Sequence, residues 1–193
     1  MRPTPAKPCD LTVPVSPLMP DANPDTDTDP DAEIELITLR EVVPSDLPIF
    51  YEQQRDPEAN RMAAFVSRDP DDREACLAHW DKILADETVV ARTILYGGQV
   101  AGHVAKFERD GRPEVTYWID RQFWNKGIAT GALARFLHTV TVRPIYGAAA
   151  ADNVASLRVL QKCGFTVVAR ERAFANARSE VIQETILTLT GSD

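Results

Sequence analysis

The stretch "EVTYWIDRQFWNKGIATGAL" (residues 114–133) decides the fold, because it joins a strand to a helix through a loop that contains a glycine. Its first seven residues are rich in β-branched and aromatic side chains, which predicts a strand. From about Ala129 the apolar side chains recur at helical spacing, at Leu133, Phe136 and Leu137. The N–H groups at the start of a helix, together with its dipole, bind anions such as phosphate. The stretch therefore predicts a phosphate site, although the same residues also suit an ordinary connection with a packing glycine.

Small and charged side chains surround the glycine of this loop. Gly127 permits a positive φ or the close approach of a ligand to the backbone. We expect the small residues Ala129 and Gly131 to leave room for a bulky ligand against the backbone. Lys126 is expected to add a positive charge for a phosphate. The loop has neither the GxxxxGKS/T pattern of a P-loop nor the GxGxxG pattern of a dinucleotide site. We therefore disfavour a nucleotide-binding module.

The rest of the chain alternates between helix and strand patterns. A strand at residues 34–40 precedes a helix for which Ser45 offers an N-cap, and a second helix is expected at 71–86. Residues 55–70 suit either a loop or a short helix. Further strands are expected at 88–95, 100–108, 114–120, 143–151, 165–170 and 179–190, with a helix at 152–164 and glycine turns at 96–99 and 109–113. This order predicts an α/β fold around one mixed sheet.

The first residues differ in composition from the rest of the 193-residue chain. Eight of its 14 prolines lie between Pro3 and Pro30, and "PDANPDTDTDPDAE" adds a run of aspartates with almost no apolar side chains. Such a segment buries too little apolar surface to offset the conformational entropy lost on folding. We therefore expect a disordered Pro/Asp-rich tail over residues 1–32 and one domain over residues 33–193.

Composition disfavours several classes of protein. The net charge of -8 disfavours broad nucleic-acid binding, which depends on neutralising phosphates. No run of about 18 apolar residues predicts a membrane helix, and the first residues lack the apolar core of a signal peptide. The three cysteines are too scattered for a disulfide framework, and the three histidines show no metal-binding pattern. We expect a cytoplasmic protein that uses no metal and binds neither nucleic acid nor membrane.

Residues 114–133, followed by "NVASLRVLQKCGF" (residues 153–165), resemble the GCN5-related N-acetyltransferase (GNAT) superfamily. The likeness is greatest to the subfamily that acetylates ribosomal-protein N-termini, and it spans residues 34–189. That subfamily often has a W-G-x-G-x-A-T loop. The corresponding residues here are Trp124, Asn125, Lys126, Gly127, Ile128, Ala129 and Thr130. Asn125 stands where a glycine is usual, and the essential Gly127 is present.

The resemblance implies a fold and a co-substrate. The fold would be a mostly antiparallel central sheet flanked by helices, with a splayed strand pair that receives acetyl-CoA. The loop N–H groups would hold the diphosphate of acetyl-CoA. The pantetheine arm would pair with the edge of the preceding strand, around Tyr117, Trp118 and Ile119. The acetyl group would pass directly to a primary amine, without a covalent enzyme intermediate.

The resemblance also implies residues for proton transfer. Glu114 is the expected base, acting directly or through water, although its carboxylate also suits a solvated strand end. Many members carry a tyrosine at the position of Leu160, as the acid that protonates the thiolate; here Ser156 is the nearest replacement. Asn153 suits either an N-cap or a contact with pantetheine, and both can hold together. His103, in the neighbouring strand, is the other candidate base.

We therefore predict an acetyl-CoA-dependent N-acetyltransferase whose acceptor is a protein N-terminus or a small-molecule amine. The alternative is a non-catalytic acyl-CoA-binding sensor. The leucine at Leu160 favours that alternative, whereas Glu114 and Ser156 argue against it. The sequence leaves open whether the chain forms a homodimer.

Overall fold

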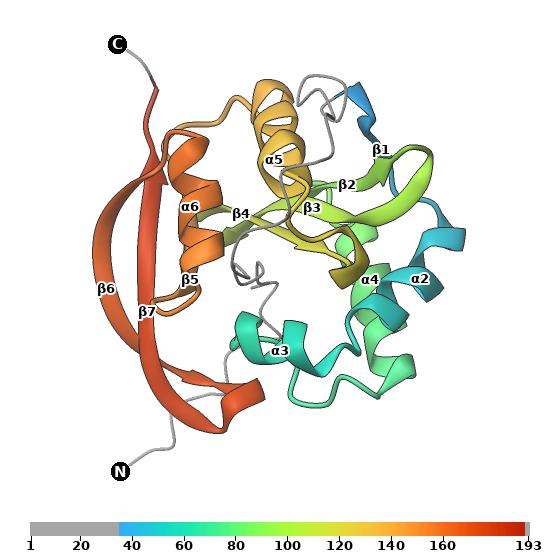
Figure 1. Ribbon diagram of the computed structural model, residues 1–193, viewed down its shortest axis with the longest axis horizontal. Helices are drawn as coiled ribbons and strands as arrows, with labels where there is room; N and C mark the ends of the chain where they lie inside the picture. Colours follow the sequence, from blue (N-terminus) through green and yellow to red (C-terminus); the bar gives the residue numbers. More distant parts are fainter. Residues whose placement is uncertain (1–34, 192–193) are drawn as a thin grey trace, which may run out of the picture.

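The computed structural model describes residues 35–191, which fold around a single sheet (Figure 1). Seven strands in this part of the chain lie in the order β1-β2-β3-β4-β5-β7-β6. Their bounds are β1 (Ile37–Glu41), β2 (Val90–Tyr96), β3 (Gln99–Arg109), β4 (Arg112–Ile119), β5 (Ile145–Ala150), β6 (Thr166–Ala175) and β7 (Glu180–Leu189). The α-helices are α2 (Leu47–Gln53), α3 (Pro57–Ala63), α4 (Arg73–Ala85), α5 (Ile128–Thr139) and α6 (Val154–Lys162).

The sheet is antiparallel except between β4 and β5. These two parallel strands share one register pair, Glu114 with Tyr146. β5 then continues its ladder with β7 on its other side, over all six of its residues. β4 and β5 therefore part after their first contact, which confirms the predicted mixed sheet with a splayed strand pair.

Helices cover both faces of this sheet. On one face, Leu133 and Phe136 of α5 and Leu160 of α6 are buried in the main apolar core. On the other face, Phe50 of α2 and Trp80 of α4 form a second core. Apolar residues at helical spacing and alternating residues along the strands account for both layers.

Several predicted elements are confirmed, and some boundaries move. The two glycine turns join β2 to β3 and β3 to β4, with positive φ at Gly98 and Gly111. Residues 55–70 contain a true helix, α3, because the Asp56 carboxylate caps it by accepting a hydrogen bond from the Ala59 N–H at 2.8 Å. The predicted tail over residues 1–32 lies outside the described residues.

The prediction that Ser45 caps α2 is wrong. Ser45 lies inside a short 3-10 turn, and the cap position belongs to Asp46. The Asp46 side chain, 2% exposed, instead accepts hydrogen bonds from Arg40 at 2.6 and 2.7 Å, Thr93 at 2.6 Å and the Val43 N–H at 3.0 Å. Burial alone would raise the pKa of Asp46, but these hydrogen bonds outweigh burial and hold the pKa below its usual range. Asp46 therefore ties β1, β2 and the start of α2 together.

Candidate active site

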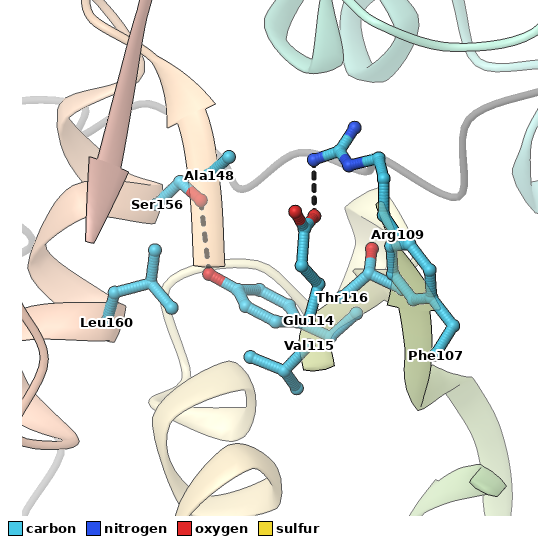
Figure 2. A pocket seen from close by; sticks show the side chains of 9 residues that line it. Phe107, Arg109, Glu114, Val115, Thr116, Ala148, Ser156 and Leu160 are labelled. Carbon is cyan, nitrogen blue, oxygen red and sulfur yellow. Dashed lines mark hydrogen bonds and ion pairs between the residues drawn. The ribbon is translucent and has the colours of Figure 1, made fainter. Parts of the chain in front are cut away.

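Glu114 and Ser156 both lie near the point where β4 and β5 part. Both line a small cavity of about 10 Å³, here called the β4–β5 cavity, which has room for about one water molecule. Its lining residues are Phe107, Arg109, Glu114, Val115, Thr116, Tyr117, Ala148, Ser156 and Leu160 (Figure 2). Glu114 comes from the start of β4, and Ser156 from the first turn of α6. The fold thus brings the predicted base and the predicted acid to one place.

An arginine fixes the carboxylate of Glu114. Glu114 is 5% exposed and forms an ion pair with the guanidinium of Arg109 (Figure 2). Glu114 pairs with Phe107 across the β3–β4 hairpin, so Arg109, two residues further on, is its diagonal neighbour on the same face. Arg109 was not among the predicted site residues, although a charged residue just across an Asp-Gly turn is a signal for such a pair.

Ser156 is held by hydrogen bonds from two directions. Its backbone N–H donates to the Asn153 side-chain oxygen at 3.1 Å. Its hydroxyl lies 3.2 Å from the phenol oxygen of Tyr117, and both residues are buried. Burial also raises the pKa of Tyr117 well above its usual range, so the phenol keeps its proton at neutral pH.

Asn153 is the N-cap of α6, as one of its two predicted roles required. Its side-chain nitrogen also donates to the carbonyl oxygen of Met62 at the end of α3, at 3.2 Å. Each polar atom of this buried side chain therefore already binds the protein. The predicted cap is therefore confirmed, the contact with pantetheine stays a prediction, and the cap sets the position of the turn that carries Ser156.

His103 lies apart from the β4–β5 cavity. Its ring is 1% exposed and packs against Phe50 and Trp80, with ring centroids 4.9 Å away in both cases. Within residues 35–191, neither ring nitrogen has a polar protein partner. Burial lowers the pKa of His103 to about 3, with a smaller effect from His79. A general base works best with a pKa near the working pH, so His103 is poorly suited to that role, and unlike Glu114 it does not line the β4–β5 cavity.

The loop before α5 has the backbone that an anion site requires. Gly127 adopts φ 70° and Asn125 adopts φ 62°. Asparagine tolerates the left-handed region better than most residues, so Asn125 preserves the conformation that the usual glycine would give. Gly127 occupies the N-cap position of α5 without a side-chain cap. The first-turn N–H groups, at Ile128, Ala129 and Thr130, are consequently available to an anion.

A cavity of about 290 Å³, here called the phosphate cavity, lies between this loop and α6. It is lined by Ile119, Phe123, Trp124, Asn125, Gly127, Ile128, Ala129, Thr130, Ala155, Arg158, Val159 and Lys162. Lys126 is not among them: its ammonium lies over the rings of Tyr96 and Phe123, 5.6 Å from each centroid.

The positive charge in the phosphate cavity therefore comes from α6. Arg158 and Lys162 stand four residues apart on the wall that faces the start of α5. Neither residue was among the predicted site residues, although their i, i+4 spacing on the helix that carries Ser156 is a signal. The role given to Gly131 also changes, because a side chain there would come within 2.6 Å of Ile37 on β1. Gly131 serves packing against β1.

The edge of β4 is partly occupied. The Asp120 N–H donates to the carbonyl oxygen of Ala101 in β3 at 2.8 Å. Because hydrogen-bonding groups alternate sides along a strand, the amide groups of Tyr117 and Ile119 point away from β3, toward the splay. The Trp124 indole donates to the Ile119 carbonyl at 2.7 Å, so Tyr117 offers the more accessible backbone edge. The side chain of Trp118 is on the opposite face, where it packs against α3.

A third cavity, here called the outer cavity, adjoins Glu114 and has a volume of about 320 Å³. Its lining residues are Arg109, Asp110, Arg112, Glu114, Tyr146, Gly147, Ala148, Glu171, Glu184 and Ile186. Glu171 and Glu184 face each other across the β6–β7 ladder. The cavity is large enough for a small ligand group, and Glu114 lies in its wall.

Within residues 35–191, no helix is long and apolar enough to cross a membrane. No three His, Cys, Asp or Glu side chains in this part of the chain gather as they would around a metal ion.

Comparison with known proteins identifies the family. Residues 37–166 match the family described as an acetyltransferase (GNAT) domain, which is more than half of the chain. The chain belongs to the GNAT acetyltransferase family. The resemblance to the GNAT superfamily that the sequence indicated is thus confirmed. The prediction of an acetyl-CoA-dependent N-acetyltransferase, in preference to a non-catalytic sensor, is confirmed as well.

Individual relatives agree with this GNAT assignment. A Bacillus subtilis (strain 168) protein, YdaF, named as a ribosomal N-acetyltransferase, is 27% identical over 143 residues, covering 68% of this chain and 78% of its own. RimL, a ribosomal L7/L12 α-N-protein acetyltransferase solved with coenzyme A, superposes with a TM-score of 0.68 at 15% identity, covering 80% of this chain and 94% of RimL. The self-immunity acetyltransferase MccE, solved with acetyl-CoA and AMP, gives 0.65 at 18% identity, covering 81% and 93%.

Proposed function

We propose that this GNAT acetyltransferase uses Glu114 and Ser156 to move the acetyl group of acetyl-CoA directly to a primary amine. The observation that carries the proposal is their convergence: a buried carboxylate from β4 and a buried hydroxyl from α6 line one cavity where the two strands part. Acetyl transfer to an amine needs a base for the amine proton and a proton for the leaving sulfur, and these two groups supply that pair.

The co-substrate would lie along α6. The N–H groups that begin α5 would hold its diphosphate, with Arg158 and Lys162 on the facing wall of the phosphate cavity. The pantetheine arm would pair with the backbone of Tyr117 at the edge of β4. The thioester would then reach the β4–β5 cavity, where Ser156 begins the same helix that carries the two cations.

In the proposed reaction, Glu114 takes up one proton and Ser156 gives up one proton. The amine nitrogen loses a proton to Glu114, directly or through water, and attacks the carbonyl carbon of the thioester. The C–S bond breaks, and the sulfur takes the proton of the Ser156 hydroxyl. Arg109 holds the Glu114 carboxylate in place during this exchange. The thiol is a fairly good leaving group, with a pKa near the ~8.5 of cysteine, so Glu114 should matter more than Ser156.

The acceptor would enter by the outer cavity, because Glu114 lies in its wall. The names of YdaF and RimL favour a protein N-terminus as the acceptor. A small cationic amine is the second candidate, favoured by the facing carboxylates of Glu171 and Glu184 in the same cavity. We place the reaction in the cytoplasm, where acetyl-CoA and both kinds of acceptor occur together.

Replacing Glu114 tests the proposal. Glu114→Gln keeps the shape of the side chain but removes its basicity, so the turnover of an accepted amine should fall by roughly 10²-fold. The acceptor is found first, by mass spectrometry of a peptide and amine panel incubated with acetyl-CoA. Glu108→Gln is the matched control, because Glu108 is another ion-paired glutamate of the same hairpin, bonded to Lys106 at 2.5 Å. Equal turnover of the two variants would remove Glu114 from the mechanism.

A further inference from the structure

Tyr117 lines the β4–β5 cavity and adds a phenol to it from β4, whereas Ser156 comes from α6. The Tyr117 hydroxyl lies 3.2 Å from the hydroxyl of Ser156 in the first turn of α6. Leu160, one turn further along α6, lines the same cavity with an apolar side chain. A leucine can give no proton to a leaving sulfur, so any hydroxyl chemistry on the α6 side of the cavity falls to Ser156 and its partner.

In the hydrogen bond between Tyr117 and Ser156, either hydroxyl could be the donor. A serine hydroxyl has one proton and two acceptor lone pairs. If Ser156 donated to Tyr117, its proton would be engaged and would point away from the thioester. If Tyr117 donates to Ser156, the serine proton remains available. Among the described residues, Ser156 is the partner that the structure gives the Tyr117 hydroxyl. With the thioester bound, the second arrangement would give each proton an acceptor: the Ser156 oxygen for the Tyr117 proton, and the sulfur for the Ser156 proton.

We propose that Tyr117 is a positioning residue that donates its hydroxyl proton to Ser156 and thereby turns the Ser156 proton toward the sulfur of acetyl-CoA. This inference rests on the proposed function of Ser156. In the reaction the C–S bond breaks and the Ser156 proton passes to sulfur. Tyr117 keeps its own proton and makes its hydrogen bond stronger as negative charge develops on the serine oxygen. The proton lost by Ser156 is restored from solvent or from Glu114 after the product leaves.

Tyr117→Phe tests this role, because it keeps the buried ring and removes the hydroxyl. We expect kcat to fall by about fivefold, the equivalent of a hydrogen bond worth about 1 kcal/mol, with little change in the KM for acetyl-CoA. Ser156→Ala should lower kcat further. The double variant should equal Ser156→Ala alone, because Tyr117 acts through Ser156. Additive effects, or an unchanged kcat in Tyr117→Phe, would overturn the inference.

Two controls separate positioning from other roles. Tyr51→Phe on α2 also removes a phenol hydroxyl, which donates a partly buried hydrogen bond to the Asp71 carbonyl at 2.9 Å. It therefore reports the cost in stability alone and should leave kcat unchanged. Replacing Tyr117 with 3-fluorotyrosine keeps the O–H but makes it more acidic. A positioning role predicts an unchanged pH–rate profile, whereas a moved alkaline limb would make Tyr117 the proton source and overturn the proposal.

The outcomes also separate this inference from the proposed function. Full activity in Ser156→Ala would remove Ser156 itself from the mechanism. Impaired Ser156→Ala with normal Tyr117→Phe would leave the proposed function intact and refute the role of Tyr117.

Discussion

Replacing Gly127 with alanine should separate backbone strain from ligand binding. Gly127 has φ +70°, and no protein atom lies within 4 Å of where its Cβ would stand. An L-residue in this left-handed region costs about 1–2 kcal/mol. In a chain of 193 residues, each kcal/mol lowers Tm by about 2–4 °C. We therefore expect Gly127→Ala to fold, with a Tm lower by about 2–8 °C.

The effect on acetyl-CoA should exceed this strain. Gly127 lines the phosphate cavity, so the empty space beside it is where the diphosphate would approach the α5 N–H groups. A methyl group there should weaken acetyl-CoA binding by at least about tenfold, or roughly 1.4 kcal/mol, measured by calorimetry. Gly127→Val, with a larger and β-branched side chain, should weaken binding further.

Gly98→Ala is the matched control for this prediction. Gly98 lies in the β2–β3 turn with φ +82° and has the same empty surroundings. The Gly98→Ala variant should lose a similar amount of stability but keep its affinity for acetyl-CoA. If Gly127→Ala and Gly98→Ala bind acetyl-CoA equally well, the anion site is not at the start of α5, and the argument from the loop is refuted.

Two other predictions concern charge. Replacing both Arg158 and Lys162 with alanine should weaken acetyl-CoA binding by about tenfold or more and reduce its salt dependence, because each loses a charge-assisted contact with phosphate; Lys82→Ala on α4 is the control, and equal loss there would show a general charge effect. Asp46→Asn should lower the stability at pH 7 by about 2 kcal/mol. Because the folded-state pKa of Asp46 is depressed, its contribution is present above the unfolded pKa of about 4 and is lost as pH falls through the folded pKa. The Tm difference from wild type should therefore shrink below about pH 4, and a constant difference would contradict the ion-pair account.

Local signals in the sequence predicted the loop before α5 and the turns of the meander. A glycine between a strand pattern and a helix pattern predicted the positive φ at Gly127, and paired turn residues located the hairpins at Gly98 and Gly111. Asn153 was likewise predictable as an N-cap. These features depend on φ, ψ and side-chain spacing within a few residues, so the sequence encodes them directly.

Contacts between distant elements required the tertiary structure. The sequence offered two candidate bases on neighbouring strands, Glu114 and His103. Only the tertiary structure shows that Phe50 and Trp80 pack around His103, which makes it a residue of the apolar core. The Tyr117–Ser156 hydrogen bond depends on where α6 crosses the splayed strands. No spacing along the chain predicts that crossing.

The phosphate cavity also combines a feature that the sequence predicted with one that only the tertiary structure decided. The sequence alone predicted a glycine at the start of a helix whose N–H groups suit an anion, because this prediction depends only on residues next to one another. It could not determine which cation would face that site, because a lysine has several rotatable bonds and its direction depends on its neighbours. The rings of Tyr96 and Phe123 draw Lys126 away, and the packing of α6 beside α5 brings Arg158 and Lys162 in its place.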